Sequence, residues 1–319
     1  MIAFEKRASV ILYNFLVSNK FSGKFLIPSN ICPIVPITFL KAKVEFEFVD
    51  ISLETLCIDE KLILEKLNKN PDFYSGIIYV NSYGVNNDIS NFSKEIRLLN
   101  TDIKIVHDKC LAIPDFSKNK LENHLIDLEI FSTGYSKYID IGYGGYAFIN
   151  SRVDYYEHQL EFNELDLEIL EKKYNHSVKN GFKYIYEDLN WLNSSKPSIN
   201  FDMYKAKVME ELEKVNEIKR KLNYIYTNNL PSEIQLDSKF QNWRFNILLP
   251  QRDEILELLF EKGLFASAHY SSLSNIFSNN NSPNAKYIDT KILNLFNDRY
   301  FSEDKAYLAC EIINKYLLK

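Results

Sequence analysis

Residues 127–150 read DLEIFSTGYSKYIDIGYGGYAFIN, two strand-like segments on either side of a loop that carries Lys137. The chain has only nine glycines in 319 residues, and four of them lie in this stretch: Gly134, Gly142, Gly144 and Gly145. Glycine is favoured where the backbone takes a positive φ or approaches another group closely. The stretch therefore predicts a tightly packed strand–loop–strand unit, in which Lys137 is either a functional residue or an exposed loop lysine.

Upstream of this unit, strand-like and helix-like segments alternate. The strand-like segments are KFLIPSN (24–30), VEFEFVDI (44–51), GIIYVNSYG (76–84) and KIVHD (104–108). The segments between them have the apolar spacing of helices. This alternation predicts an α/β fold with a mostly parallel central sheet flanked by helices.

The pattern changes near residue 150, where long helical stretches rich in Glu, Lys, Leu and Tyr begin. We expect a large α/β domain over residues 1–150, with part of 151–200 packed against it. Residues 201–319 are expected to form a long connecting helix and a small C-terminal α+β domain, in which WRFNILLP (243–250) is a strand.

Composition excludes several classes of protein. The net charge of −5 is not that of a nucleic-acid-binding protein, which would present a basic face. No apolar run approaches the roughly 20 residues that span a bilayer, and the N-terminus lacks the pattern of a signal peptide. The four cysteines have no paired spacing, which favours free thiols in a reducing compartment and no metal site. We expect a soluble cytoplasmic protein.

Three polar residues follow predicted strands: Ser29 after KFLIP, Asp108 in KIVHD and Lys137 after DLEIFSTGYS. In an open α/β sheet, ligands bind beyond the carboxyl ends of the strands. An acid, a lysine and glycines that converge there match the needs of pyridoxal 5'-phosphate (PLP). A PLP site uses a lysine for the Schiff base, a carboxylate that keeps the pyridine nitrogen protonated, and backbone N–H groups for the phosphate.

The order of these pieces resembles the fold-type-I PLP enzymes of the DegT/StrS sugar aminotransferase family, and the resemblance covers nearly the whole chain. IKIVHDKCLAI (103–113) resembles the family's "I.VIEDAAQA", which implies that Asp108 is the carboxylate at the pyridine nitrogen. FSTGYSKYIDIGYGG (131–145) resembles "FSFHPTKN…GEGG", which implies that Lys137 is the Schiff-base lysine and Ser132 a phosphate ligand.

Other segments extend the resemblance to the rest of the cofactor site. Arg7 and Ala8 match the family's phosphate turn. The segment INFDM (199–203) resembles "YNYRM", which implies that Asn200 reaches the phosphate in the neighbouring subunit and that the protein is a homodimer. Cys32 falls where the family has an aromatic residue that stacks on the PLP ring.

Four residues are candidate substrate contacts. GLFASAHYSSL (263–273) resembles "GI.T..HYPPL" and brings His269 and Tyr270 into register with the family. His269 could equally be a hydrogen-bonded structural histidine. Arg244, in QNWRFNI, could bind the carboxylate of an amino donor or form a salt bridge at a strand edge. Tyr143, in GYGG, stands where the family has glutamate.

The chain also departs from the family pattern. The usual glycine of the phosphate turn is replaced by Lys6, and the Gln or His three residues after the aspartate is Leu111. The arginine of "NYR" is replaced by Asp202, and Cys32 and Tyr143 differ as described above. These changes affect the ring contacts and the nucleotide-sugar pocket, but they leave the pair of Lys137 and Asp108 intact.

The resemblance implies a PLP-dependent aminotransferase that transfers an amino group from an amino acid, with glutamate expected, to a keto-sugar. The sugar is expected to be nucleotide-linked and to serve surface-glycan biosynthesis. Two alternatives remain open. One is a PLP-dependent sugar dehydratase or other lyase, which the lysine disfavours because such relatives carry histidine at this position. The other is a degenerate homologue without catalytic activity.

Overall fold

The computed structural model describes residues 1–117, 121 and 123–318, and its central element is a seven-stranded mixed sheet. The strands follow the order β1 (Ile2–Glu5), β7 (Gly145–Ile149), β6 (Leu128–Ser132), β5 (Lys104–Asp108), β4 (Tyr74–Val80), β2 (Lys24–Pro28) and β3 (Phe46–Val49). From β6 to β3 all neighbours are parallel, whereas β7 is antiparallel to both β6 and β1. The expected mostly parallel sheet is confirmed.

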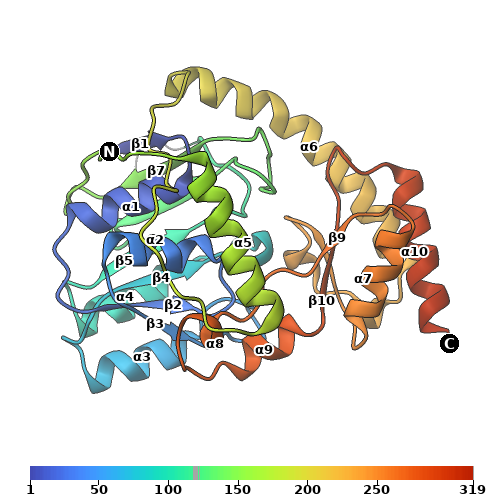
Figure 1. Cartoon of the computed structure of the whole chain (residues 1–319), viewed down its shortest axis with the longest axis horizontal. Coiled ribbons are helices and arrows are strands. Elements are labelled where there is room, and N and C mark those ends of the chain that lie inside the picture. The colour runs from blue at the N-terminus through green and yellow to red at the C-terminus, as the bar shows by residue number, and fades with distance from the viewer. Residues whose placement is uncertain (118–120, 122, 319) are drawn as a thin grey trace.

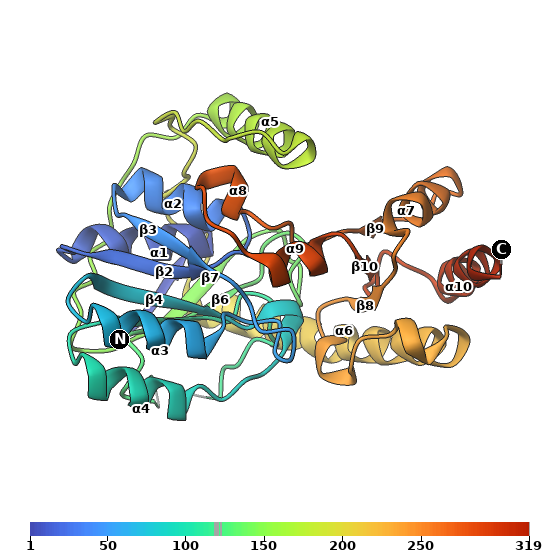
Figure 2. The same ribbon diagram turned by 90° about the horizontal axis from the view of Figure 1, so that it is seen from below.

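Helices cover both faces of this sheet (Figure 2). On one face lie α1 (Ala8–Ser18) and α2 (Ile34–Ala42), which pack against Val106, Leu128 and Ile130. On the other lie α3 (Glu60–Lys69) and α4 (Ser90–Leu99), which pack against Ile77 and Ile105. Since side chains alternate along a strand, both faces of the sheet are buried, as in other parallel sheets.

A second, smaller body lies at the far end of α6 (Phe201–Asn229), the long helix that connects the two (Figure 1). Its sheet has the order β8 (Phe245–Leu248), β10 (Ile292–Leu295) and β9 (Ala266–Ser267). The helices α7 (Arg252–Glu261) and α10 (Glu303–Leu317) share one apolar core with this sheet and with the end of α6. Short 3₁₀ turns at η2 (Ser232–Ile234) and η3 (Ser238–Phe240) lead from α6 to β8.

Part of the chain after β9 returns to the large body. The short helices α8 (Ser274–Phe277) and α9 (Pro283–Asp289) lie against it in Figure 2. Leu273 and Ala285 belong to the two apolar clusters of the large sheet, and the backbone of Ala285 donates a hydrogen bond to Asp50. The division at residue 200 into two domains therefore stays a prediction.

Strand β1 and the extended segments around α5 (Glu164–Asn180) differ from the expected pattern. The region after residue 150 was expected to be mainly helical, but residues 155–163 and 182–199 are largely irregular. Among the described residues, no helix is long and apolar enough to cross a membrane.

Candidate active site

The carboxyl ends of β5 and β6 bring Asp108 and Lys137 together. Asp108 is the last residue of β5, and its Oδ1 accepts a hydrogen bond from the backbone N–H of Cys110 at 2.8 Å. Lys137 lies in the loop after β6. The thiols of Cys32 and Cys110 interact electrostatically with both the carboxylate and the ammonium group. These four side chains therefore lie near one another at the carboxyl edge of the sheet.

The two thiols show what kind of environment this is. Burial raises the pKa of the Cys32 thiol, against the opposing effect of the Lys137 cation. Burial raises the pKa of Cys110 well above its ordinary value, and the anion of Asp108 raises it further. Both cysteines are nevertheless partly accessible. Both thiols therefore lie in a largely buried environment close to Asp108 and Lys137.

The glycines of the loop are explained by close packing. Gly144 has φ +95, and a Cβ on it would lie 2.5 Å from Tyr204 and 2.8 Å from Thr133 Oγ1. A Cβ on Gly145 would lie 2.4 Å from the backbone nitrogen of Ala8. The loop is closed by a hydrogen bond from Thr133 N to Gly144 O at 2.9 Å, and Thr133 Oγ1 bonds the hydroxyl of Tyr204 at 2.8 Å.

The same packing places the start of α1 beside Ser132. The helix begins at Ala8, its N-cap residue Arg7 gives no side-chain cap, and no acidic residue lies in the first turn. The guanidinium of Arg7 lies within 3.2 Å of the position that a Cβ on Gly134 would take. Ser132 is buried, and its Oγ accepts a hydrogen bond from Gly134 N at 3.3 Å. The N–H groups at the start of α1, a guanidinium and a hydroxyl form a group that can bind a phosphate.

Buried polar atoms at the ends of β2 and β4 also lack partners. Among the described residues, no hydrogen bond reaches Ser29 Oγ or Asn81 Nδ2. A buried polar atom without a partner costs about 1–3 kcal/mol, so such atoms mark places where a ligand can supply the bond. With a carboxylate, a lysine and a phosphate-binding group nearby, the residues at these strand ends fit PLP.

The small body brings His269 and Tyr270 to this site. The ring of Tyr270 stacks on Trp243 at 5.8 Å and 16°, and burial raises its pKa well above the ordinary value, helped by Cys32 and Asp108. Burial lowers the pKa of His269 to about 4, and the cations of Arg244 and Lys137 add to this. The His269 side chain is exposed to solvent but surrounded by protein, so it lies in a concave part of the surface.

Other predicted site residues have partners within the chain. Arg244 is 2 % exposed, and its Nη1 forms a salt bridge with Asp298 at 2.8 Å, which is the alternative considered for it. Asn200 is exposed and caps α6 by accepting a hydrogen bond from Met203 N at 2.9 Å. Tyr143 is half-buried, with the ammonium of Lys207 lying 5.2 Å from its ring centroid. The roles predicted for these residues toward cofactor or substrate stay predictions.

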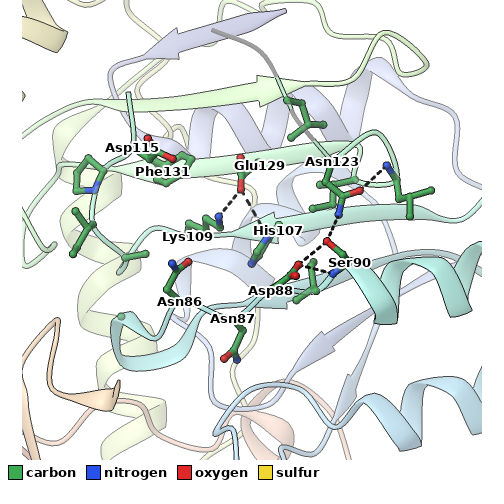
Figure 3. A pocket seen from close by; sticks show the side chains of 18 of the residues that line it. Asn86, Asn87, Asp88, Ser90, His107, Lys109, Asp115, Asn123, Glu129 and Phe131 are labelled. Carbon is green, nitrogen blue, oxygen red and sulfur yellow. Dashed lines mark hydrogen bonds and ion pairs between the residues drawn. The ribbon is translucent and has the colours of Figure 1, made fainter. Parts of the chain in front are cut away.

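The side chain of His107 points to the face of the sheet opposite to that of the next residue, Asp108, because side chains alternate along a strand. Its Nε2 is 2.9 Å from Asn81 Oδ1, and it lines a cavity of about 770 Å³ that does not include Asp108 or Lys137 (Figure 3). In that cavity Lys109 forms an ion pair with Glu129 at 2.6 Å.

Sequence reasoning missed three members of the site. Cys110 could have been found, because it follows Asp108 by two residues in the segment that carries the resemblance. Thr133 and Tyr204 could not, because their hydrogen bond joins residues 71 positions apart and no local pattern encodes it.

Comparison with known proteins identifies the family of the chain. A family model, described as the DegT/DnrJ/EryC1/StrS aminotransferase family, matches residues 38–309. No protein with a curated description matches the sequence significantly.

Several solved structures share the fold at low sequence identity. The putative sugar aminotransferase Spr1654 from Streptococcus pneumoniae, in its PMP form, has a TM-score of 0.69 and 15% identity, with 98% of this chain and 87% of that chain covered. PseC from Helicobacter pylori, an aminotransferase involved in pseudoaminic acid biosynthesis, has a TM-score of 0.69 and 17% identity, with 98% and 86% covered. The E. coli GDP-4-keto-6-deoxy-D-mannose-3-dehydratase, with bound hydrated PLP, has a TM-score of 0.63 and 20% identity, with 98% and 87% covered.

Proposed function

Since this chain belongs to the DegT/DnrJ/EryC1/StrS aminotransferase family, we propose that it is a PLP-dependent aminotransferase acting on a keto-sugar. The amino donor is an amino acid, with glutamate as the first candidate, and the sugar is nucleotide-linked and destined for a surface glycan. The observation that carries the proposal is that Lys137 and Asp108 lie close to the same two buried thiols, Cys32 and Cys110, at the carboxyl ends of β5 and β6.

Each residue has a distinct task in this proposal. When bound, PLP supplies an electron sink and a carrier for the amino group. Lys137 Nζ would hold the cofactor covalently, and its amine would accept the proton from the α-carbon of the amino acid. Asp108 keeps the pyridine nitrogen protonated. The first turn of α1, Arg7 and Ser132 bind the phosphate.

The proposed homodimer completes the phosphate site with Asn200 of the partner subunit. Its support is the position of Asn200, exposed at the start of α6. Light scattering on the purified protein tests the dimer. We place the reaction in the cytoplasm, which fits four free cysteines.

The covalent role of Lys137 is tested by mass spectrometry after borohydride reduction in the presence of PLP. The wild type should gain one PLP at Lys137, and glutamate should change its visible absorbance. Lys137→Ala should bind no PLP covalently, whereas Asp108→Asn should still bind it but lose turnover. Covalent PLP on Lys137→Ala at another residue would overturn the assignment.

A dehydratase remains the second candidate, favoured by the similarity to the E. coli dehydratase fold. The two reactions separate in one assay with a panel of keto-sugars. An aminotransferase produces amino-sugar in proportion to the glutamate consumed, whereas a dehydratase releases water from the sugar. A wild-type protein that takes up no PLP would instead support the degenerate homologue.

A further inference from the structure

Trp243, which lies just before β8, contacts four other segments of the chain. The residue is 1 % exposed, and each of its polar atoms is used. Its backbone nitrogen donates to Tyr83 O at 3.4 Å, and its carbonyl accepts from the buried Nζ of Lys219 on α6 at 2.8 Å. Its indole nitrogen donates to Ser136 O at 2.6 Å. The side chain is therefore fixed before any ligand binds.

The bond to Ser136 acts on the residue immediately before Lys137. Ser136 has φ 57, a left-handed conformation that is uncommon for a residue with a side chain. Its own N–H donates to Asp140 Oδ2 at 2.9 Å, within the same loop. A bond within the loop therefore holds the N–H of Ser136, and Trp243, 107 residues away, holds its carbonyl. The direction in which Lys137 leaves the backbone depends on both bonds.

The packing around Trp243 adds a second connection to the site. Gly84 has φ +78, and a Cβ on it would lie 2.9 Å from Trp243 N, so the turn after β4 can approach the tryptophan only because it carries no side chain. On the other side, the Trp243 ring stacks on Tyr270, whose hydroxyl is influenced by Asp108. Trp243 therefore supports both the Lys137 loop and the aromatic ring beside it.

We propose that Trp243 is a positioning residue that holds the backbone of Lys137 in the conformation needed to capture PLP. It acts from the segment just before β8, through the carbonyl of Ser136, and need not touch the cofactor. This inference rests on the proposed role of Lys137. It predicts that loss of the indole N–H slows covalent capture and leaves the phosphate-binding residues around α1 unaffected.

The test compares Trp243→Phe with Trp191→Phe. The chain has two tryptophans, and Trp191 is also buried, in a cluster with Leu170 and Leu192. Hydrogen–deuterium exchange on protein without PLP should show residues 134–142 exchanging about tenfold faster in Trp243→Phe, equivalent to about 1.4 kcal/mol, and unchanged in Trp191→Phe. Unchanged exchange in Trp243→Phe overturns the proposal.

A second measurement separates positioning from general destabilisation. The rate of covalent attachment, trapped with borohydride, should fall about tenfold in Trp243→Phe. The Kd for non-covalent PLP, measured in Lys137→Ala with and without Trp243→Phe, should stay the same. Equal losses in both quantities would show only a structural role and overturn the proposal.

The exchange experiment also keeps this inference distinct from the proposed function. A wild type that attaches no PLP refutes the function, while faster exchange of residues 134–142 in Trp243→Phe still supports control of the loop by Trp243. A wild type that attaches PLP, together with normal exchange and normal attachment in Trp243→Phe, refutes the positioning role and leaves the function standing.

Discussion

Replacing Gly145 with alanine should separate α1 from the Lys137 loop and weaken PLP binding. A Cβ at this position would lie 2.4 Å from Ala8 N, 2.6 Å from Ala8 Cα and 2.9 Å from Arg7 C. Ordinary contact begins at 3.4 Å, so the backbones must move apart by about 1 Å. All three contacts are backbone atoms, which cannot rotate away as the end of a side chain could.

The strain from this methyl group falls on the first turn of α1. Gly145 is paired on one side with Glu5 of β1 and on the other with Ser132 of β6, so the sheet holds it in place. Overpacking of this kind costs about 1–3 kcal/mol of folding free energy. Because the displaced turn and Ser132 are the proposed phosphate ligands, the Kd for PLP should rise at least about tenfold, equivalent to about 1.4 kcal/mol.

Titration of PLP into the apo-protein and urea unfolding measure the two effects. Gly181→Ala is the matched control, because Gly181 has φ +67 but nothing lies within 4 Å of an added Cβ. It should lose about 1 kcal/mol of stability through its left-handed conformation and bind PLP normally. If Gly145→Ala bound PLP as tightly as the wild type, the close approach of α1 to β7 would not form the phosphate site.

Three further changes test the surroundings of the site. Tyr204→Phe removes the hydrogen bond to Thr133 Oγ1, and urea unfolding should show a loss of about 1 kcal/mol. Burial lowers the pKa of Lys219 well below its ordinary value of 10.5, so the unfolded state binds more protons. The stability of the wild type relative to Lys219→Met should therefore rise as the pH increases toward 10.5, and a flat difference would contradict this. The pKa of His269 falls from 6.5 to about 4, so the folded protein should lose stability as the pH drops through this range, whereas His269→Gln should lose less.

The large sheet was predictable from sequence because its strands are parallel and buried on both faces. The segments around β2, β4 and β5 are apolar runs bounded by polar residues, and this pattern alone locates them. Strand β1 has no such pattern: it is four residues long and ends at Glu5, and it forms only because β7 offers an antiparallel edge more than 140 residues later. The two short strands β9 and β10 depend on tertiary pairing in the same way.

Residues of the candidate site could be predicted from sequence where the proposed chemistry requires a particular residue type. They could not be predicted where only packing determines the residue. Asp108 and Lys137 stand out because few residue types can serve a pyridine nitrogen or a covalent cofactor link. The contact from Trp243 to Ser136 has no sequence signal, since a tryptophan before a strand is usually a core residue. The sequence leaves two roles open for Arg244, and only the position of Asp298 shows that its buried guanidinium already has an ion-pair partner.

Two departures from the family pattern, Leu111 and Cys32, are related through the aromatic residues that lie near both. Leu111, which replaces a polar Gln or His, is 4 % exposed and lies in the same apolar cluster as Trp243 and Tyr83, with Tyr270 packed against it. A polar side chain there would need a partner inside an apolar cluster, at a cost of about 1–3 kcal/mol if it found none. The stack of Trp243 on Tyr270 lies near Cys32, the residue that stands where the family pattern has an aromatic. We therefore interpret Cys32 and Leu111 as parts of an altered ring pocket that the stacked rings of Trp243 and Tyr270 support.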